Sequence, residues 1–157
     1  MADWLQLFQR YLPDFLKGAA VTIELTVVGL ALGFVVGILL ALARLYGPTW
    51  LKMLAIGYIE LCRGTPLLVQ LFLIYYGLPS LGVTLSQTIS AYLALGLNSA
   101  AYQAEYFRGA IQSIGASQMT AGRAIGLSRW KTIWFIILPQ ALRLMIPAWG
   151  IAPISLL

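Results

Sequence analysis

The sequence has no histidine, a single cysteine and few charges of either sign. Only 10% of its 157 residues are charged and 61% are hydrophobic, whereas a soluble domain averages about 25% and about 45–50%. Cys62 has no partner for a disulfide within the chain. Without histidine and with only scattered carboxylates, a metal site or a nucleophile–base pair is not expected. These absences argue against a soluble enzyme and favour a membrane protein.

The sequence also lacks a nucleotide-binding pattern. No glycine-rich run precedes Lys17, Lys52 or Lys131 in the pattern G-x-x-x-x-G-K-[ST], so a P-loop is missing. We therefore expect neither an ATPase site nor a cofactor in this chain. The net charge of +5 does not indicate a nucleic-acid partner, because cytoplasmic loops of membrane proteins carry an excess of Lys and Arg.

Long uncharged runs predict membrane-spanning helices. A helix needs about 20 mostly apolar residues to cross a bilayer, and its backbone groups must be paired within the segment. No charge occurs between Leu25 and Ala43 or between Arg63 and Glu105. The Gly- and Pro-containing stretch 77–82 divides the second run. The predicted complete spans cover about residues 19–43, 64–81 and 83–104.

The last apolar stretch is interrupted by Arg143. An arginine in the middle of the bilayer costs at least about 2.5–3.5 kcal/mol, so we place Arg143 at the cytoplasmic interface. The residues that remain, 144–157, are fewer than a crossing needs. We therefore expect a partial fourth span there, in a chain truncated at its C-terminus. The expected fold class is an all-α integral membrane protein, a single helical bundle over residues 1–157.

Lys and Arg are distributed unevenly along the chain. Arg44, Lys52 and Arg63 fall in the connection 44–63, and further basic residues follow the third predicted span, whereas the 77–82 turn has none. Basic loops face the cytoplasm. We therefore expect the N-terminus outside and a loop over 105–143 inside.

This loop is predicted to contain two short helices. Ser117 can cap a helix that ends near Ile125, and Gly126 suits the left-handed position that follows it. Ser128 can cap the second helix, and Pro139 would bend that helix toward the membrane.

The residues alone leave two interpretations of the loop open. Gly115, Gly122 and Gly126 lack side chains, so another protein surface could approach the backbone closely. Alternatively, the basic residues and Trp130 could hold an amphipathic helix pair on the lipid surface.

The same loop resembles the "EAA" loop of ABC-transporter permeases. That pattern reads E-A-A, three residues, G, nine residues, I-x-L-P. At the same spacing this sequence has Thr120-Ala121-Gly122, then Gly126, then Ile136, Leu138 and Pro139. Thr replaces the usual Glu, and Gly replaces the second Ala.

Two further stretches are similar to polar amino acid permeases of the histidine, glutamine and arginine uptake type. They are IELCRGTPLLVQLFLIYYGLP (59–79) and LNSAAYQAEYFRGAIQSI (97–114). The resemblance covers about residues 18–150. It departs at Ile151-Ala152-Pro153, where relatives usually have Asn-Glu-Phe.

The resemblance implies a fold, a location and partners. It implies a type I ABC importer permease in the bacterial inner membrane, whose loop forms a coupling helix in a groove of the ATPase. The implied partners are an ATP-binding subunit that binds the ATP, a periplasmic or extracellular substrate-binding protein, a second permease copy or homologue, and membrane lipid. The residues expected to couple the chain to the ATPase are Thr120, Ala121, Gly122, Arg123, Gly126 and Ser128.

Polar side chains within spans are candidates for the substrate pathway, because they are costly there. Glu24 could receive the ammonium group of an amino acid, and Gln70 and Asn98 could donate to its carboxylate. Tyr102 follows on the Asn98 face at i+4. The alternative is that such groups only join helices, at about 0.6 kcal/mol each. Arg63 is expected to anchor the second span instead of binding a ligand.

We therefore expect a permease subunit, not itself an enzyme, that moves a polar amino acid inward. An ion-coupled secondary transporter would need buried acid pairs within the spans, where the sequence has only Glu24. A non-transporting assembly or anchor protein would show faces of small residues. Gly29, Gly33 and Gly37 supply one such face, which could equally be the contact between two permeases.

Overall fold

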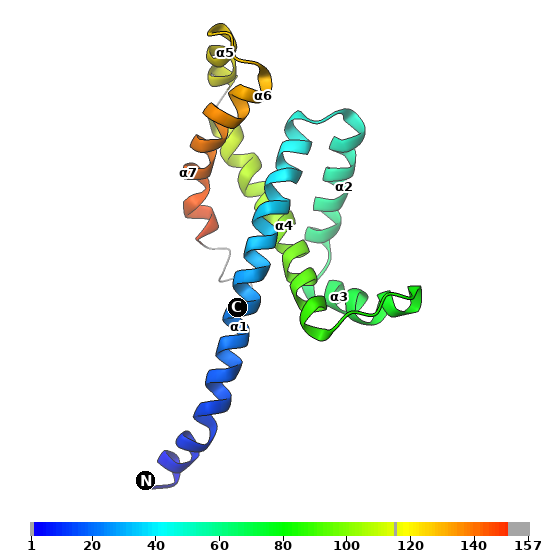
Figure 1. Cartoon of the computed structure of the whole chain (residues 1–157), viewed down its shortest axis with the longest axis vertical. Coiled ribbons are helices and arrows are strands. Elements are labelled where there is room, and N and C mark those ends of the chain that lie inside the picture. The colour runs from blue at the N-terminus through cyan, green and yellow to red at the C-terminus, as the bar shows by residue number, and fades with distance from the viewer. Residues whose placement is uncertain (1, 115, 151–157) are drawn as a thin grey trace.

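The computed structural model describes residues 2–114 and 116–150, and this part of the chain is helical and has no β-strand. The prediction of an all-α protein is thereby confirmed for these residues. Helix α1 (Ala2–Tyr46) forms the long axis, and α4 (Gln87–Ser113) crosses it (Figure 1). Gly115 and the segment 151–157 of the expected fourth span lie outside the described residues.

The remaining helices lie on either side of this crossing (Figure 1). On one side, α2 (Thr49–Gly64) and α3 (Leu67–Phe72) follow α1. On the other, α5 (Ala116–Ala124), α6 (Arg129–Thr132) and α7 (Leu138–Trp149) follow α4. Arg143 lies exposed within α7, so the helix around the expected fourth span begins well before residue 144.

By length and hydropathy, one helix of the described residues can cross a membrane, over Gln6–Tyr46. Thr49–Gly64 together with Leu67–Leu81 passes the same test as a pair bent by 107°. The bend has a local cause, because the residue before a proline avoids the helical region. Thr65 is accordingly extended, with φ −117° and ψ 140°, ahead of Pro66. The segment expected to connect two spans, 44–63, is therefore mostly helix.

Two Leu-Pro pairs each follow a widened helical turn. The π-helical turns η1 (Leu73–Gly77) and η3 (Ile133–Ile137) end just before Leu78-Pro79 and Leu138-Pro139. A proline offers no N–H to the carbonyl four residues earlier, and a turn with one extra residue accommodates this loss. At Pro139 the helix therefore widens and continues into α7. After Pro79, the 3-10 helix η2 (Leu78–Leu81) ends at Gly82, which has a φ of 83°.

Helices α1 and α4 approach each other along a face of glycines. A Cβ on Gly33 would lie 2.6 Å from both Gln103 Nε2 and Ser99 Oγ, and one on Gly37 would lie 3.0 Å from Gln103 Cβ. Gln103 is fully buried, and its Nε2 donates to Leu30 O (3.1 Å) and to Ser99 Oγ (2.9 Å). From the sequence, the glycine face could have been the contact between two permeases. In the structure it is covered by the chain's own α4.

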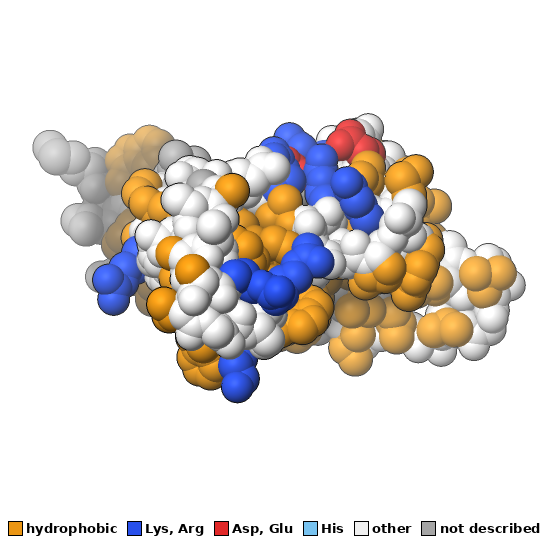
Figure 2. Space-filling view, turned by 90° about the horizontal axis from the view of Figure 1, so that it is seen from above, with side chains coloured by type: hydrophobic (Ala, Val, Ile, Leu, Met, Phe, Trp, Pro, Cys, Tyr) orange, Lys and Arg blue, Asp and Glu red, His pale blue; other side chains and the backbone are white. Residues whose placement is uncertain are grey.

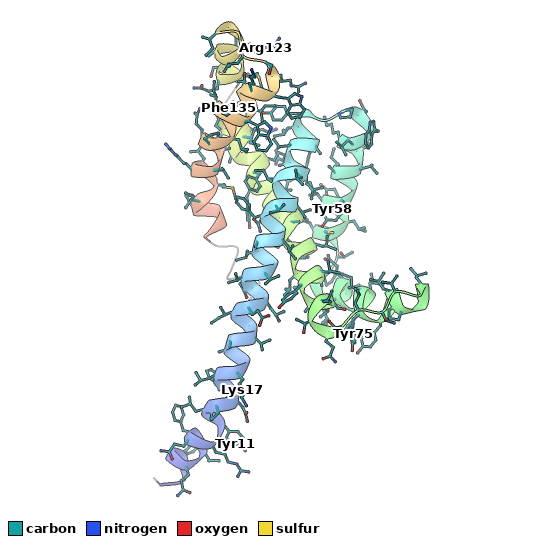
Figure 3. All side chains as sticks on the ribbon, viewed as in Figure 1. Tyr11, Lys17, Tyr58, Tyr75, Arg123 and Phe135 are labelled. Carbon is teal, nitrogen blue, oxygen red and sulfur yellow. The ribbon has the colours of Figure 1, made fainter. Side chains whose placement is uncertain are left out.

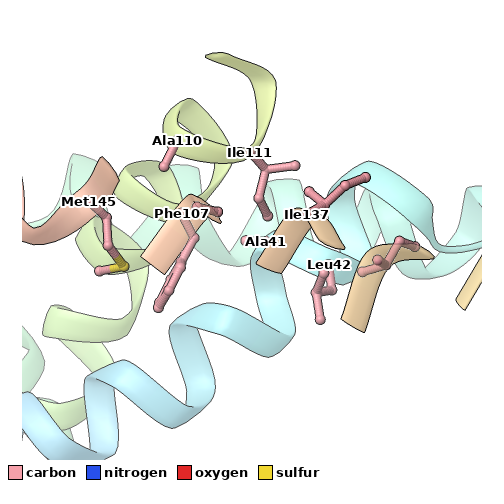
Figure 4. Packing of buried hydrophobic residues seen from close by; sticks show 9 residues of the cluster. Ala41, Leu42, Phe107, Ala110, Ile111, Ile137 and Met145 are labelled. Carbon is pink, nitrogen blue, oxygen red and sulfur yellow. The ribbon is translucent and has the colours of Figure 1, made fainter. Parts of the chain in front are cut away.

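The hydrophobic core lies where the end of α1 meets α4 and the stretch from η3 to α7 (Figure 4). The Phe34 and Phe107 rings meet edge to face, with centroids 5.2 Å apart, a geometry that aromatic pairs prefer. The core thus ties the segments before and after α5 to α1. Its buried members are Ala41, Leu42, Phe107, Ala110, Ile111, Ile133, Ile137, Ala141 and Met145.

We predict that Gly33→Ala destabilises the protein by about 1–3 kcal/mol, because overpacking forces the two backbones apart. Thermal unfolding of the purified protein in detergent measures the effect. Gly57→Ala is the matched control, since a Cβ at Gly57 meets nothing within 4 Å. It should be neutral or stabilise the helix by up to about 1 kcal/mol. Equal unfolding temperatures for the two variants would contradict the close approach.

Candidate functional site

A polar cavity of about 500 Å³ lies beside the break between α2 and α3. The break supplies one wall, and α4 supplies the other. Two of the four predicted pathway residues, Asn98 and Tyr102, line it. The lining residues are Arg63, Gly64, Thr65, Pro66, Leu67, Asn98, Tyr102 and Tyr106.

Gln70 holds the break in place. A helix leaves its last carbonyls without partners, and the Gln70 amide nitrogen donates to Cys62 O (2.8 Å), Thr65 O (3.2 Å) and Thr65 Oγ1 (2.8 Å). Its amide oxygen accepts a hydrogen bond from Asn98 Nδ2 at 3.3 Å. The amide nitrogen is therefore engaged within the chain, and Gln70 positions Asn98 from behind the cavity wall.

Arg63 brings a positive charge to the same cavity. Its guanidinium carbon lies 5.6 Å from the centroid of the Tyr102 ring, within the range of a cation–π contact. The sequence was interpreted as using Arg63 only to anchor a span. Pro66, three residues later, was the sequence feature that could have indicated this cavity position of Arg63. The helix break at Pro66 opens the space that Arg63 borders.

Glu24 is not brought to this cavity. It is exposed on α1 and accepts a hydrogen bond from the Tyr92 hydroxyl on α4. Tyr92 precedes Asn98 by six residues, which is about 9 Å along a helix. Glu24 is absent from the cavity lining. The structure thus gathers Gln70, Asn98 and Tyr102 and leaves Glu24 on a separate part of the α1–α4 contact.

Glu105 of α4 pairs with two arginines, of which Arg44 joins α4 to α1 and Arg108 lies on α4 itself. Arg44 of α1 pairs with Glu105 Oε1, and Arg108 Nη2 lies 2.7 Å from Glu105 Oε2. Burial raises the pKa of Glu105, but the hydrogen bonds from Arg108 and the charges of Arg44, Arg108 and Arg63 outweigh it, so the pKa lies below its usual value. The carboxylate therefore stays ionised between its partners.

Helices α5 and α6 are joined by a tight turn. Gly126 has a φ of 84°, as predicted. Leu127 N–H donates to Gly122 O (3.1 Å), and Gly126 N–H donates to Arg123 O (3.0 Å), the pair of bonds that defines a Schellman ending. The predicted capping of the second helix is also confirmed, because Ser128 Oγ accepts from Lys131 N–H (3.4 Å).

Two other expectations for this loop need correction. Ser117 was expected to precede the first helix as its cap, but α5 already begins at Ala116. Gly122 was expected to admit another protein's surface, but it is buried and Thr132 of α6 occupies that space. A Cβ on Gly122 would lie 2.8 Å from Thr132 Oγ1. The glycine therefore fixes the angle between α5 and α6.

The opposite face of α5 is open. Thr120, Ala121 and Arg123 are exposed, and the Thr120 hydroxyl donates to Ala116 O within the helix (3.1 Å). Ile125, just after the helix, is 74% exposed. Figure 3 shows Arg123 at the end of the molecule farthest from Lys17 and Tyr11. A closely packed pair of helices thus presents a small, basic and partly apolar surface at this end.

A long apolar helix, a broken helix pair and a cavity at the break are typical of helical membrane transport proteins. Among the described residues, no group of three or more His, Cys, Asp or Glu side chains is placed to hold a metal. The chain belongs to the family of binding-protein-dependent transport system inner membrane components, which matches residues 4–157. The predicted resemblance to ABC-transporter permeases is confirmed.

Relatives and a solved structure agree with this assignment. The chain is 41% identical over 150 residues to the glutamine transport system permease protein GlnP of Escherichia coli, covering 94% of this chain and 68% of that protein. It is 39% identical to the L-cystine transport system permease protein TcyB of Bacillus subtilis, covering 98% and 66%. The crystal structure of an amino acid ABC transporter with histidines matches with a TM-score of 0.84 and 36% identity, covering 96% and 70%.

We predict that Glu105→Gln lowers the free energy of unfolding by about 1–3 kcal/mol at neutral pH, because two arginines lose a charged acceptor. The folded-state pKa lies below the unfolded value of about 4.3. The stabilisation is thus fully present above that pH and is lost as the pH falls through the folded-state pKa. Thermal unfolding in detergent across the acidic range measures the difference between wild type and variant.

The control is Asp14→Asn, which removes an exposed pair with Lys17. Exposed pairs contribute only about 0–1 kcal/mol, so this variant should unfold almost as the wild type does. A wild-type advantage over Glu105→Gln that stays constant down to the lowest pH would contradict the role of the ionised carboxylate.

Proposed function

We propose that the chain is the permease subunit of an ATP-binding-cassette importer and moves a polar amino acid through the cavity beside the α2–α3 break. The observation that carries this proposal is the composition of the cavity. Asn98 offers an amide, Tyr102 and Tyr106 offer hydroxyls, and Arg63 offers a positive charge in one space of about 500 Å³. The named substrates of similar permeases, glutamine and L-cystine, support a substrate of this chemical class.

The cavity suits the carboxylate of an amino acid. Interrupted helices form the substrate sites of many transporters, because the backbone is irregular only where it lines a cavity. Arg63 supplies a charge-assisted partner for an anion, and Asn98, which is 7% exposed, supplies a hydrogen-bonding group at the wall. Gln70 acts as a positioning residue. Glu24 is a separate candidate for an ammonium group, at its contact with Tyr92.

The α5–α6 unit is the proposed contact with the ATP-binding subunit. Thr120, Ala121 and Arg123 would face that subunit, whereas Gly122, Gly126 and Ser128 hold the unit rigid behind them. Rigidity favours this interpretation over an amphipathic pair resting on lipid, because a coupling element must transmit movement. The core ties η3 and α7 to α1 and α4, so a displacement of the unit would reach the helices that border the cavity.

The complete transporter would contain an ATP-binding subunit that binds and hydrolyses the ATP, a substrate-binding protein outside the membrane, and a second permease copy or homologue. We propose that the chain itself has no ATPase site and no cofactor. Its N-terminus would lie outside and the α5–α6 unit inside, with spans formed by α1, the bent α2–α3 pair, α4 and the helix through α7. An ion-coupled transporter is less well supported, because the partly buried carboxylate of Glu105 pairs with two arginines and not with a second acid.

We predict that Asn98→Ala raises the KM for amino acid uptake about tenfold, since a substrate group left without its hydrogen-bond partner costs about 1–3 kcal/mol. Uptake into proteoliposomes that contain the complete transporter measures this. The unfolding temperature should change little, because Asn98 makes a single long bond to Gln70. Ser80→Ala is the control and should keep the wild-type KM, because Ser80 lies exposed in η2 and does not line the cavity. An unchanged KM for Asn98→Ala would remove Asn98 from the pathway.

We also predict that Gly126→Leu abolishes coupled ATPase activity and uptake while the chain still inserts in the membrane. A leucine at a φ of 84° costs about 1–2 kcal/mol and would reorient α5. Gly109→Leu is the matched control, because Gly109 is exposed, has no positive φ and would place its Cβ in open space. Normal substrate-stimulated ATPase activity in Gly126→Leu would refute the coupling role of this turn.

A further inference from the structure

A second, apolar groove lies between α1, α2 and the helix that follows α5. Its volume is about 660 Å³, within the range of small-molecule sites. Apart from the hydroxyls and ring nitrogens of two tyrosines and two tryptophans, its side chains are hydrocarbon or glycine. The lining residues are Val36, Leu39, Leu40, Leu42, Ala43, Tyr46, Gly47, Pro48, Leu51, Leu54, Ala55, Tyr58, Trp130 and Trp134. None of them lines the polar cavity beside the α2–α3 break.

The length of the groove matches one leaflet of a bilayer. From Val36 to Tyr46 the α1 wall rises by about 15 Å, and the hydrocarbon core of a bilayer is about 30 Å thick. One end of the groove lies at Tyr46 and Pro48, where α1 turns into α2, and is bordered by Trp130. Tyr and Trp are the residues that gather at the boundary between hydrocarbon and headgroups.

A cation lies at this aromatic end, and two more follow lining residues of the groove in the sequence. The Arg129 guanidinium carbon lies 5.3 Å from the centroid of the Tyr46 ring. Lys131 follows Trp130 and Lys52 follows Leu51, and all three cations are exposed. In the part of the chain that the structure describes, neither Arg129 nor Lys131 forms an ion pair. Figure 2 shows basic side chains lying across this end of the molecule, next to exposed hydrophobic ones.

We infer that this groove binds an anionic glycerophospholipid of the leaflet on the α5 side. One acyl chain lies against Leu39, Leu54 and Tyr58, and the phosphate lies beside the Arg129 guanidinium at the aromatic end, with Lys131 adding charge at the same membrane surface. The charge at the aromatic end selects an anionic headgroup over a zwitterionic one, because basic residues at a membrane surface attract anionic lipids. The apolar wall selects a lipid over a free phosphate. Since Trp130 and Arg129 belong to α6, the lipid would contact α1, α2 and the α5–α6 unit together.

The test uses quenching of tryptophan fluorescence by lipids with brominated acyl chains. The full chain is assembled with its ATP-binding subunit and retains Trp130 alone, the other four tryptophans being replaced by phenylalanine. Vesicles of phosphatidylcholine and phosphatidylglycerol keep the same total anionic fraction. Only one of the two lipids carries bromine in each preparation. Brominated phosphatidylglycerol should quench Trp130 at least about twice as strongly as brominated phosphatidylcholine does.

Charge variants show whether the preference arises at this groove. Arg129→Gln with Lys131→Gln should remove the difference between the two brominated lipids, whereas Arg129→Lys with Lys131→Arg should keep it. Lys17→Gln, an exposed cation near the opposite end of the molecule, should also keep it. A variant retaining Trp4 alone should be quenched equally by both lipids.

Two outcomes would overturn the inference. Equal quenching of Trp130 by both lipids would mean that the groove meets only the ordinary lipid surroundings. Absence of quenching by either lipid would mean that protein covers the groove, as a second copy of the chain or a partner subunit would.

Discussion

The close packing of α1 against α4 is the contact on which the other features depend. It requires glycine at Gly33 and Gly37, and it is fixed in register by the buried amide of Gln103. Because this register is fixed, Tyr92 meets Glu24 near one end of the contact and Glu105 meets Arg44 near the other. Asn98 lies between these two polar contacts on α4, at the level where α2 breaks. The glycine face thus determines where Tyr92, Asn98 and Glu105 are placed.

Prolines then create the irregular places that a uniform bundle would lack. Pro66 ends α2 and leaves carbonyls that Gln70 satisfies, whereas Pro79 and Pro139 each follow a π-helical turn. An irregular backbone within a membrane is tolerated where the protein itself pairs the freed groups. At Pro66 the break opens a polar cavity. At Pro139 the widened turn lets η3 continue into α7, and both segments contribute residues to the core.

The polar cavity, the α5–α6 unit and the apolar groove lie on one connected set of helices. Thr132 packs on Gly122 in the α5–α6 unit, and its neighbour Ile133 belongs to the core that includes Ala41. Tyr46 and Trp130, from α1 and α6, meet at the apolar groove. Packing therefore connects the α5–α6 unit to α1 and α4. A bound lipid would add a further contact between the same helices.

The sequence by itself determined the class of the protein and the local chemistry of its turns. Uncharged runs predicted an all-α membrane protein, and Gly126 predicted a left-handed turn after α5, because hydropathy and backbone sterics act over a few residues. The resemblance of residues 120–139 to the EAA loop predicted a permease. The sequence could not predict that Thr132 fills the space at Gly122 or that α4 covers the glycine face of α1, since a face of small residues fits an outside partner equally well. The tertiary structure alone decided that Arg63 borders the cavity and that Glu24 does not. Those positions follow from the bend at Pro66 and the register of α1 on α4, which depend on contacts between residues far apart in the chain.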